Sequence, residues 1–235
     1  GQNDPLAKNA TAAVIRLTNE FRREHDLSPV EKNSALENTA QYFANFMART
    51  NKYGHQADGN TAAQRAKEHG YDYCVVLENI AYRYRSTGFE EGVLGEKFFT
   101  GWRESPEHRK NMLDPSVTQT GVAIAAGDKE GLYYAVQMFG RPESARVEFR
   151  IRNASGEAVH YLLSGRGFEN SDELSTGVLR KHRVCRPPQL KLMPHEQPQR
   201  LEVSAGGEYV VVKEDGELTV QRVSEEAERN RQSNR

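Results

Sequence analysis

The sequence predicts an α+β protein in which a domain of helices around a small sheet precedes a small all-β domain. Three observations support this prediction. Apolar residues recur at helical spacing in the N-terminal part, two strand-like runs follow them and end near Gly140, and from Arg146 the apolar spacing changes to every second residue. The expected limits are residues 1–140 for the first domain, 141–222 for a β-sandwich domain and 223–235 for a flexible tail.

The first two expected helices have start signals followed by apolar stripes. Asp4 followed by a proline is typical of a helix start, and residues 3–25 then place apolar side chains at helical spacing. Residues 33–50 repeat that spacing behind a capping residue, which is either Asn33 or Ser34. Both segments are therefore expected to be amphipathic helices that bury one face.

Three shorter helices are expected next. Residues 61–70 start at a capping residue, Asn60 or Thr61, and end at a glycine. A fourth helix is expected over residues 89–105, and a short one follows Pro106. These helices complete the helical part of the first domain.

The strands follow in two groups. Residues 120–127 and 132–140 are separated by the turn sequence DKEG and predict an antiparallel hairpin. In the second domain, Val147, Phe149 and Ile151 share one face of a strand with period two. Further turns are expected at 153–156, 206–207 and 215–216. This spacing of short strands indicates a sandwich.

Composition excludes two classes of function. Hydrophobic residues make up 37% of the chain and charged residues 28%, with a formal net charge of −1. A protein that binds nucleic acid by neutralising phosphates needs a clear basic excess, which this chain lacks. No apolar run approaches the roughly 18 residues of a membrane helix. The expected partners therefore include no nucleic acid, and no transmembrane segment is expected.

The chain start and the cysteines bear on the compartment. The sequence begins with Gly1 rather than methionine, which indicates a processed N-terminus from which a signal peptide has been removed. Cys74 and Cys185 either form one disulfide, which would join the two expected domains, or leave Cys74 as a buried thiol. A disulfide is typical of an oxidising compartment. The sequence favours a secreted or cell-envelope protein.

Three segments of the first domain carry side chains suited to chemistry: His55 in a glycine-flanked turn, Glu78 in ENIAY, and His108 in GWRESPEHRKNML. Two neutral imidazoles on separate elements suit a weakly held divalent ion such as zinc, with water in the remaining positions. Glu78 would accept a hydrogen bond from one ring N–H, tie the backbone of its own segment, or do both. His55 alone could simply be a turn residue. Arg65 and Arg109 are expected to be surface or ion-pair residues.

The order and spacing of these segments resemble the CAP superfamily of cysteine-rich secretory proteins, antigen 5 and pathogenesis-related proteins, above all its bacterial SCP-like branch. The resemblance covers about residues 8–140. It rests on IRLTNEFRREHDLSPV, GH followed by DG, ENIAY, WRESPEHRKNML, TGVAIA and YYAVQMFG. It implies a three-layer α-β-α sandwich with a central cavity.

The resemblance also implies roles for individual residues. It makes His55 and His108 the cavity histidines and Glu78 the first cavity glutamate. Many members have a second glutamate three residues after a tryptophan, whereas this chain has Ser105 at that position and Glu104 one step earlier. The expected site is therefore two metal-binding histidines supported by Glu78, with Ser105 and Glu104 nearby.

Three functions follow from these residues. The first is a non-catalytic binding module for a divalent metal or a small, lipid-like ligand, with an extracellular protein or polymer as another partner. The second is a metal-assisted hydrolase or protease that uses His55, Glu78 and His108, or Ser105 as a nucleophile. Against the nucleophile, serine before Pro106 is expected to cap a helix, and the sequence has no glycine-serine elbow. The third is a structural or adhesion protein with a vestigial cleft, in which the β domain is a docking module.

Overall fold

The structure is a computed structural model that describes residues 4–165, 167–193 and 200–223. The chain divides into two compact units, unit 1 (Gly1–Ser144) and unit 2 (Ala145–Arg235). Unit 1 mixes helices with a sheet and unit 2 is built from strands, which confirms the expected α+β class. From position 224 onward, the tail expected over 223–235 lies outside the described residues.

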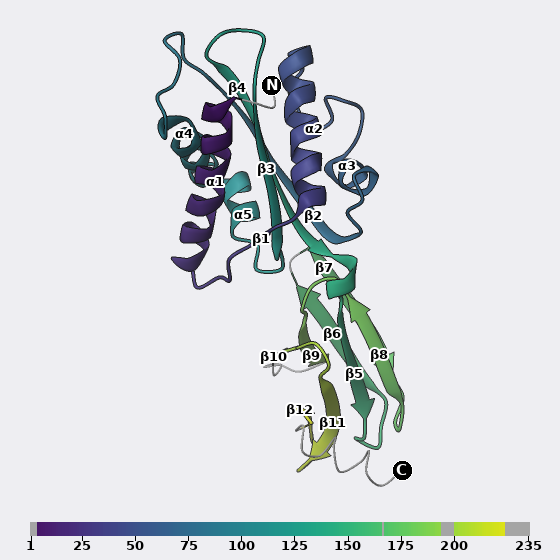
Figure 1. Cartoon of the computed structure of the whole chain (residues 1–235). Coiled ribbons are helices and arrows are strands. Elements are labelled where there is room, and N and C mark those ends of the chain that lie inside the picture. The colour runs from purple at the N-terminus through teal and green to yellow at the C-terminus, as the bar shows by residue number, and fades with distance from the viewer. Residues whose placement is uncertain (1–3, 166, 194–199, 224–235) are drawn as a thin grey trace. The chain divides into compact units, whose positions relative to one another are not determined.

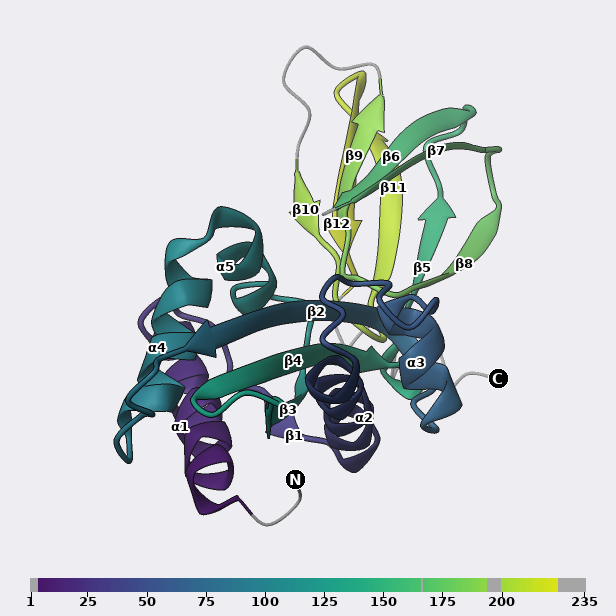
Figure 2. The ribbon, with the colours of Figure 1, turned by 90° about the horizontal axis from the view of Figure 1, so that it is seen from above.

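Unit 1 is a three-layer sandwich, as expected. Its elements are α1 (Pro5–Arg23), β1 (Glu31–Lys32), α2 (Ser34–Thr50), α3 (Ala62–Glu68), β2 (Tyr73–Tyr84), α4 (Val93–Glu104), α5 (Pro106–Met112), β3 (Gln119–Ala126), β4 (Leu132–Pro142) and the 3-10 turn η1 (Glu143–Ala145), which crosses into unit 2. The sheet has the order β1-β3-β4-β2. Helices α1, α4 and α5 cover one face, and α2 and α3 cover the other (Figure 1; Figure 2).

The helices of unit 1 begin at residues whose side chains accept hydrogen bonds from the first turn. Asp4 caps α1, and Asn33 caps α2 by accepting from two backbone amides of that helix, so the cap is Asn33 and not Ser34. At α3 the cap is Thr61, which exchanges hydrogen bonds with Gln64 in a capping box. These local signals fix where each helix starts and hence where the preceding loop ends.

Helix α4 begins at Val93, so the helix expected over residues 89–105 is shorter than predicted. The residue before it, Gly92, has φ 85°, a left-handed conformation that a helix cannot contain. At the other end Ser105 is extended, with φ −82° and ψ 120°, and it separates α4 from α5. α4 and α5 are therefore two separate helices and not one continuous helix.

The sequence analysis missed β2, although with 12 residues it is the longest strand. It pairs antiparallel with β4, with Glu78 opposite Met138, and within the described residues its other edge has no strand partner. Side chains cover that edge instead: the Ile80 carbonyl accepts hydrogen bonds from Trp102 Nε1 and from the Tyr53 hydroxyl, each at 3.2 Å. An edge strand closed in this way is a firm support for side chains that project from it.

Both faces of the sheet in unit 1 are closely packed. On one face, Leu36 and Phe43 of α2 join a fully buried apolar cluster with the sheet. On the other, Phe21 of α1 and Phe99 of α4 meet edge to face, with ring centroids 6.0 Å apart. Helix α2 crosses β3 so closely that a Cβ on Gly121 would lie 2.2 Å from the backbone of α2. Only glycine fits at that crossing.

Unit 2 is a sandwich of two four-stranded sheets around one apolar cluster (Figure 2). Val147, Phe149 and Ile151 alternate into this core, as their spacing predicts. The strands are β5 (Val147–Asn153), β6 (Val159–Gly165), β7 (Phe168–Leu174), β8 (Leu179–Val184), β9 (Gln189–Met193), β10 (Leu201–Glu202), β11 (Glu208–Glu214) and β12 (Glu217–Arg222). Strands β7 and β9 were not predicted: β7 has few apolar residues, whereas β9 alternates Leu190 and Leu192 into the core, but over only five residues.

The two cysteines are oxidised. Cys74 and Cys185 are both disulfide-bonded, and since the sequence has no other cysteine they form one bridge. The disulfide, one of the two alternatives that the sequence left open, is confirmed. Cys74 is therefore not a free thiol.

Candidate functional site

His55 is held by a buried carboxylate. It lies in the turn between α2 and α3, and its Nδ1 is 2.8 Å from Glu78 Oε1. The Glu78 side chain is only 2% exposed, whereas that of His55 is 57% exposed. Because Nδ1 is engaged by Glu78, Nε2 is the ring nitrogen that remains for a ligand. In the described residues, the Glu78 carboxylate accepts hydrogen bonds from the His55 ring and from Arg65. Among these residues it accepts none from the backbone of its own segment.

Arg65 organises the turn that carries His55. Its guanidinium donates to Glu78 Oε2 and to Asp58 Oδ1, each at 2.7 Å, and also to the His55 carbonyl at 2.9 Å. It also lies 3.6 Å above the centroid of the Phe43 ring, and its side chain is fully buried. Arg65 is thus an ion-pair residue, one of the two expectations for it. The sequence analysis did not place Arg65 or Asp58 in the site.

His108 is half-buried on α5. Burial lowers the pKa of its imidazole below the ordinary value of 6.5, and positive charge at His55 and at Arg83 lowers this pKa further. That the rings of His55 and His108 share one site stays a prediction. At neutral pH the His108 ring is neutral, which is the form that ligates a metal.

Two side-chain amides, those of the buried Asn79 and the half-buried Asn111, attach α5 to β2. Asn79 Nδ2 donates to the His108 carbonyl at 3.2 Å, and Asn111 Nδ2 donates to Asn79 Oδ1 at 3.0 Å and to the Glu78 carbonyl at 3.3 Å. Asn79 also donates to Gln137 of β4. These bonds place the helix that carries His108 against the strand that carries Glu78. No sequence signal for this amide cluster had been used.

Ser105 and Glu104 are not bonded to the other expected site residues in the described part of the chain, and their place near the site stays a prediction. Glu104 is exposed. Ser105 is the N-cap residue of α5, as expected, but its hydroxyl makes no cap hydrogen bond. The Ser105 carbonyl accepts a hydrogen bond from the Arg109 amide. Pro106, the first residue of α5, has a φ angle that already suits a helix.

Two exposed tyrosines lie close to the histidine turn. Tyr53 and Tyr82 are 48% and 51% exposed, and their rings meet edge to face with centroids 5.1 Å apart. The hydroxyl of Tyr53 is fixed on the Ile80 carbonyl, and burial raises its pKa above 10. Fixed aromatic rings with an exposed face can contact an organic ligand at low entropic cost. The sequence analysis overlooked this surface.

The donor set can be compared with what a divalent cation needs. Both oxygens of Glu78 accept hydrogen bonds, from His55 and from Arg65, so Glu78 supports a ligand and does not act as one. His55 Nε2 and the neutral ring of His108 remain as ligands. Two imidazoles with water suit a weak, exchangeable zinc, because a structural zinc normally has four protein ligands. The chemistry of two imidazoles, although not yet their separation, is suited to such an ion.

Comparison with known proteins gives sequence relatives over unit 1. The chain is 27% identical to the Bacillus subtilis protein YkwD over 129 residues, which are 54% of this chain and 46% of that protein. It is 29% identical to the Bacillus subtilis membrane protein YlbC over 112 residues, 47% of this chain and 30% of that protein. The chain spans less than half the length of these curated relatives.

Solved structures resemble the same part of the chain. An outer surface protein of Borrelia burgdorferi has a TM-score of 0.50 and 20% identity, over 58% of this chain and 95% of its own, which shows a shared fold. An extracellular SCP-domain protein of Bacillus anthracis has a TM-score of 0.48 and 25% identity, over 57% and 41% of the two chains. In the described part of this chain, no helix combines the length and apolarity that crossing a membrane requires.

The family assignment rests on a match to a whole family model. Residues 15–139 match the model of the CAP, or cysteine-rich secretory protein, family, and this segment is more than half of the 235 residues. It includes α2 to α5, β2 and β3, and with them His55, Glu78 and His108. The chain therefore belongs to the CAP (cysteine-rich secretory protein) family.

Proposed function

We propose that unit 1 is a non-catalytic binding domain that takes a divalent cation, zinc in the first instance, on His55 and His108. The observation that carries the proposal is the 2.8 Å hydrogen bond between His55 Nδ1 and Glu78 Oε1. It fixes the ring and leaves Nε2 as the ligand atom, in the arrangement that carboxylates impose on metal-binding histidines. The lowered pKa of His108 supports a second neutral ligand.

Two features favour binding over hydrolysis. A hydrolytic base needs a carboxylate or imidazole free to take a proton from water or from a nucleophile. Glu78 is engaged on both oxygens by His55 and Arg65, and Ser105 makes no hydrogen bond to a histidine in the described part of the chain. His55 Nε2 remains as a possible base, but in the described part of the chain no hydrogen bond joins it to a nucleophile.

We also propose that unit 1 contacts an organic ligand or an extracellular partner, and that the protein is secreted or lies at the cell envelope. The exposed rings of Tyr53 and Tyr82 beside the histidine turn would contact an organic, lipid-like ligand or the surface of an extracellular partner. The disulfide of Cys74 with Cys185 supports secretion or exposure at the cell envelope. Unit 2 would serve as the docking module.

Calorimetric titration of zinc chloride into the full chain tests the metal site. We expect one weak site, which His55→Ala and His108→Ala each abolish and Glu78→Gln weakens about tenfold or more through the loosened ring of His55. The matched control is His160→Ala, because His160 is a 61% exposed histidine of unit 2. This variant should bind zinc like the wild type.

Two results would overturn the proposal. The metal site is excluded if the wild type takes up no zinc, or if either alanine variant keeps the wild-type affinity while its circular dichroism is unchanged. The non-catalytic assignment is excluded by zinc-dependent hydrolysis of casein or of p-nitrophenyl acetate that both alanine variants abolish.

A further inference from the structure

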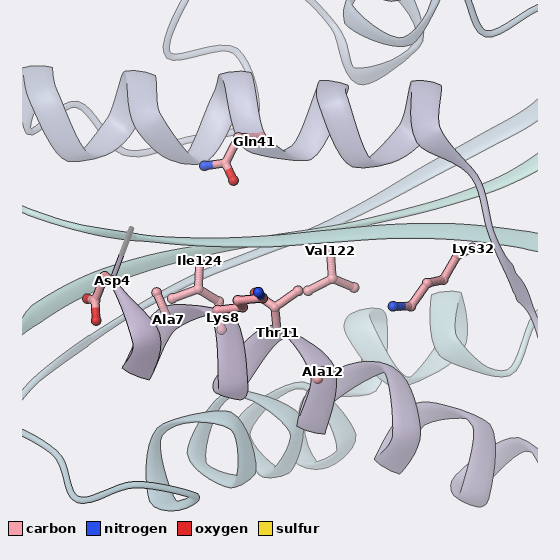
Figure 3. A pocket seen from close by; sticks show the side chains of 9 residues that line it. All are labelled: Asp4, Ala7, Lys8, Thr11, Ala12, Lys32, Gln41, Val122 and Ile124. Carbon is pink, nitrogen blue, oxygen red and sulfur yellow. The ribbon is translucent and has the colours of Figure 1, made fainter. Parts of the chain in front are cut away.

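A groove lies between α1 and α2 on the side of unit 1 where the sheet ends with β3 (Figure 3). Its volume is about 250 Å³, and Val122 and Ile124 of β3 form its floor. Thr11 and Lys8 of α1 form one wall, and Lys32 of β1 lies at one end. The groove shares no lining residue with the histidine site, so it is a separate feature of the fold.

The groove exists because β1 ends early. β1 pairs in parallel with β3 at Gln119 and Thr120, and Asn33 then starts α2, so the chain leaves the sheet edge after two residues. The Thr120 carbonyl accepts from the Asn33 amide at 3.0 Å. Beyond Thr120, this edge of β3 has no strand beside it in the described residues, whereas the other edge pairs with β4. The groove occupies the path that β1 would have followed.

The floor presents backbone groups that lack partners. Backbone groups in a strand alternate between its two edges, so Val122 and Ile124 face the same edge as Thr120, away from β4. Within the described residues, neither residue has a hydrogen bond on that edge. Each is only 4% exposed. Two N–H and two C=O groups therefore face the groove, where an added strand could pair with them.

The backbone groups of the floor and the two lysines of the lining indicate what kind of molecule the groove binds. An extended peptide offers N–H and C=O groups at the spacing of alternate β3 residues, whereas an acyl chain offers none. Lys8 and Lys32 make no ion pair with another described residue. The one carboxylate of the lining, Asp4, caps the first turn of α1, so the lining has two lysines against one acid and a net positive charge. We propose that this groove binds a short, extended, acidic peptide segment, which adds to β3 as a strand in line with β1.

The size of the groove is consistent with a short segment. Its volume of about 250 Å³ lies below the range of about 300–1,000 Å³ for drug-sized ligands. Val122 and Ile124 together offer a pairing length of roughly 7 Å, the rise of two strand residues. A segment of three or four residues would fill this length, with alternate side chains reaching Lys8 and Lys32.

Amide hydrogen exchange of the full chain tests the floor. In the free protein, we expect the amides of Val122 and Ile124 to exchange faster than those of Gly121 and Ala123, which face β4. Adding acetyl-Val-Glu-Val-Glu-amide should protect Val122 and Ile124 and shift their NMR signals. Equal protection of all four amides in the free protein would show that the edge is already paired and would overturn the proposal.

Two controls separate strand addition from charge attraction. The same peptide N-methylated at alternate residues cannot donate along one edge and should bind about tenfold more weakly or worse, because it loses two backbone hydrogen bonds. The double variant Lys8→Glu/Lys32→Glu should lose the acidic peptide and bind acetyl-Val-Lys-Val-Lys-amide instead. The control Lys97→Glu changes an exposed lysine of α4 outside the groove and should behave like the wild type.

The remaining outcomes contradict strand addition. Undiminished binding of the N-methylated peptide, NMR shifts confined to residues away from β3, or no binding at millimolar peptide would each exclude it. Zinc uptake by Lys8→Glu/Lys32→Glu should equal that of the wild type, because the groove contains neither His55 nor His108. Failure of one proposal is therefore distinguishable from failure of the other.

Discussion

The guanidinium of Arg65 connects the parts of the histidine site. It holds the turn through the His55 carbonyl and through Asp58, and it holds β2 through Glu78. The carboxylate side chains of Asp58 and Glu78 are 1% and 2% exposed, so each depends on a nearby cation for its charge. Arg65 thus positions the His55 ring indirectly. It binds the His55 carbonyl and the Glu78 carboxylate, and that carboxylate holds the ring.

Replacing Arg65 by methionine tests this dependence. The variant leaves two buried carboxylates without their cation, so we expect the free energy of unfolding of unit 1 to fall by about 3–5 kcal/mol. Urea unfolding followed by the fluorescence of Trp102, the only tryptophan, measures it. The control Arg16→Met removes an exposed pair with Glu20 and should cost less than about 1 kcal/mol. Similar losses in the two variants would contradict the structural role of Arg65.

At this scale the sequence predicts His55, Glu78 and His108 as site residues, but it does not predict the residues that hold them in place. The bond between His55 and Glu78 follows from the chemistry of the two groups. The bond from Arg65 does not, because an arginine on a short helix is as well suited to the surface. Only the turn over Phe43, with the ring 3.6 Å below the guanidinium, makes burial favourable, and that packing is not encoded locally.

At the scale of elements, helices with caps and the hairpin of β3 and β4 are predictable, whereas β2 is not. Strands are recognised by alternation of polar and apolar residues, and β2 lacks it because helices cover both of its faces. Glu78 and Asn79 are adjacent, polar and both buried, which no simple period describes. The two polar residues of the candidate site therefore interrupt the alternation by which β2 could have been recognised.

The crossing of α2 over β3 leads to a prediction about Gly121. A Cβ at this position would lie 2.2 Å from the Glu37 amide nitrogen, and helix backbone cannot rotate away. Gly121→Ala should therefore lower the free energy of unfolding of unit 1 by about 3 kcal/mol. Guanidinium unfolding with Trp102 fluorescence measures the loss.

The matched control is Gly127→Ala. Its Cβ would meet the end of the flexible Leu132 side chain, which can rotate, so the cost should stay below about 1.5 kcal/mol. If Gly121→Ala is tolerated as well as Gly127→Ala, α2 lies farther from the sheet than the structure has it.

At the scale of the whole molecule, the two units have separate cores. The apolar cluster that contains Leu36 and Phe43 draws only on unit 1, and the one that contains Phe149 and Tyr161 draws only on unit 2. Each cluster is therefore complete without residues of the other unit. Folding of the histidine site should not require the β-sandwich.

A chain truncated after Ser144, with Cys74→Ser to remove the unpaired thiol, tests this independence. We expect the truncated chain to show a cooperative urea transition by Trp102 fluorescence and to take up zinc with the affinity of the full chain. Loss of the transition would mean that unit 1 depends on unit 2 for its stability. A folded fragment that no longer binds zinc would assign part of the site to unit 2.

The two edges of the sheet in unit 1 differ in a way that bears on solubility. At the outer edge of β2, side chains such as Trp102 already donate to backbone carbonyls. A strand of another molecule therefore cannot pair with this edge. The edge of β3 lies recessed between α1 and α2 (Figure 3), where the edge of another whole sheet cannot reach. The fold thus resists edge-to-edge aggregation, even at high concentration, while one edge stays accessible to a single thin chain.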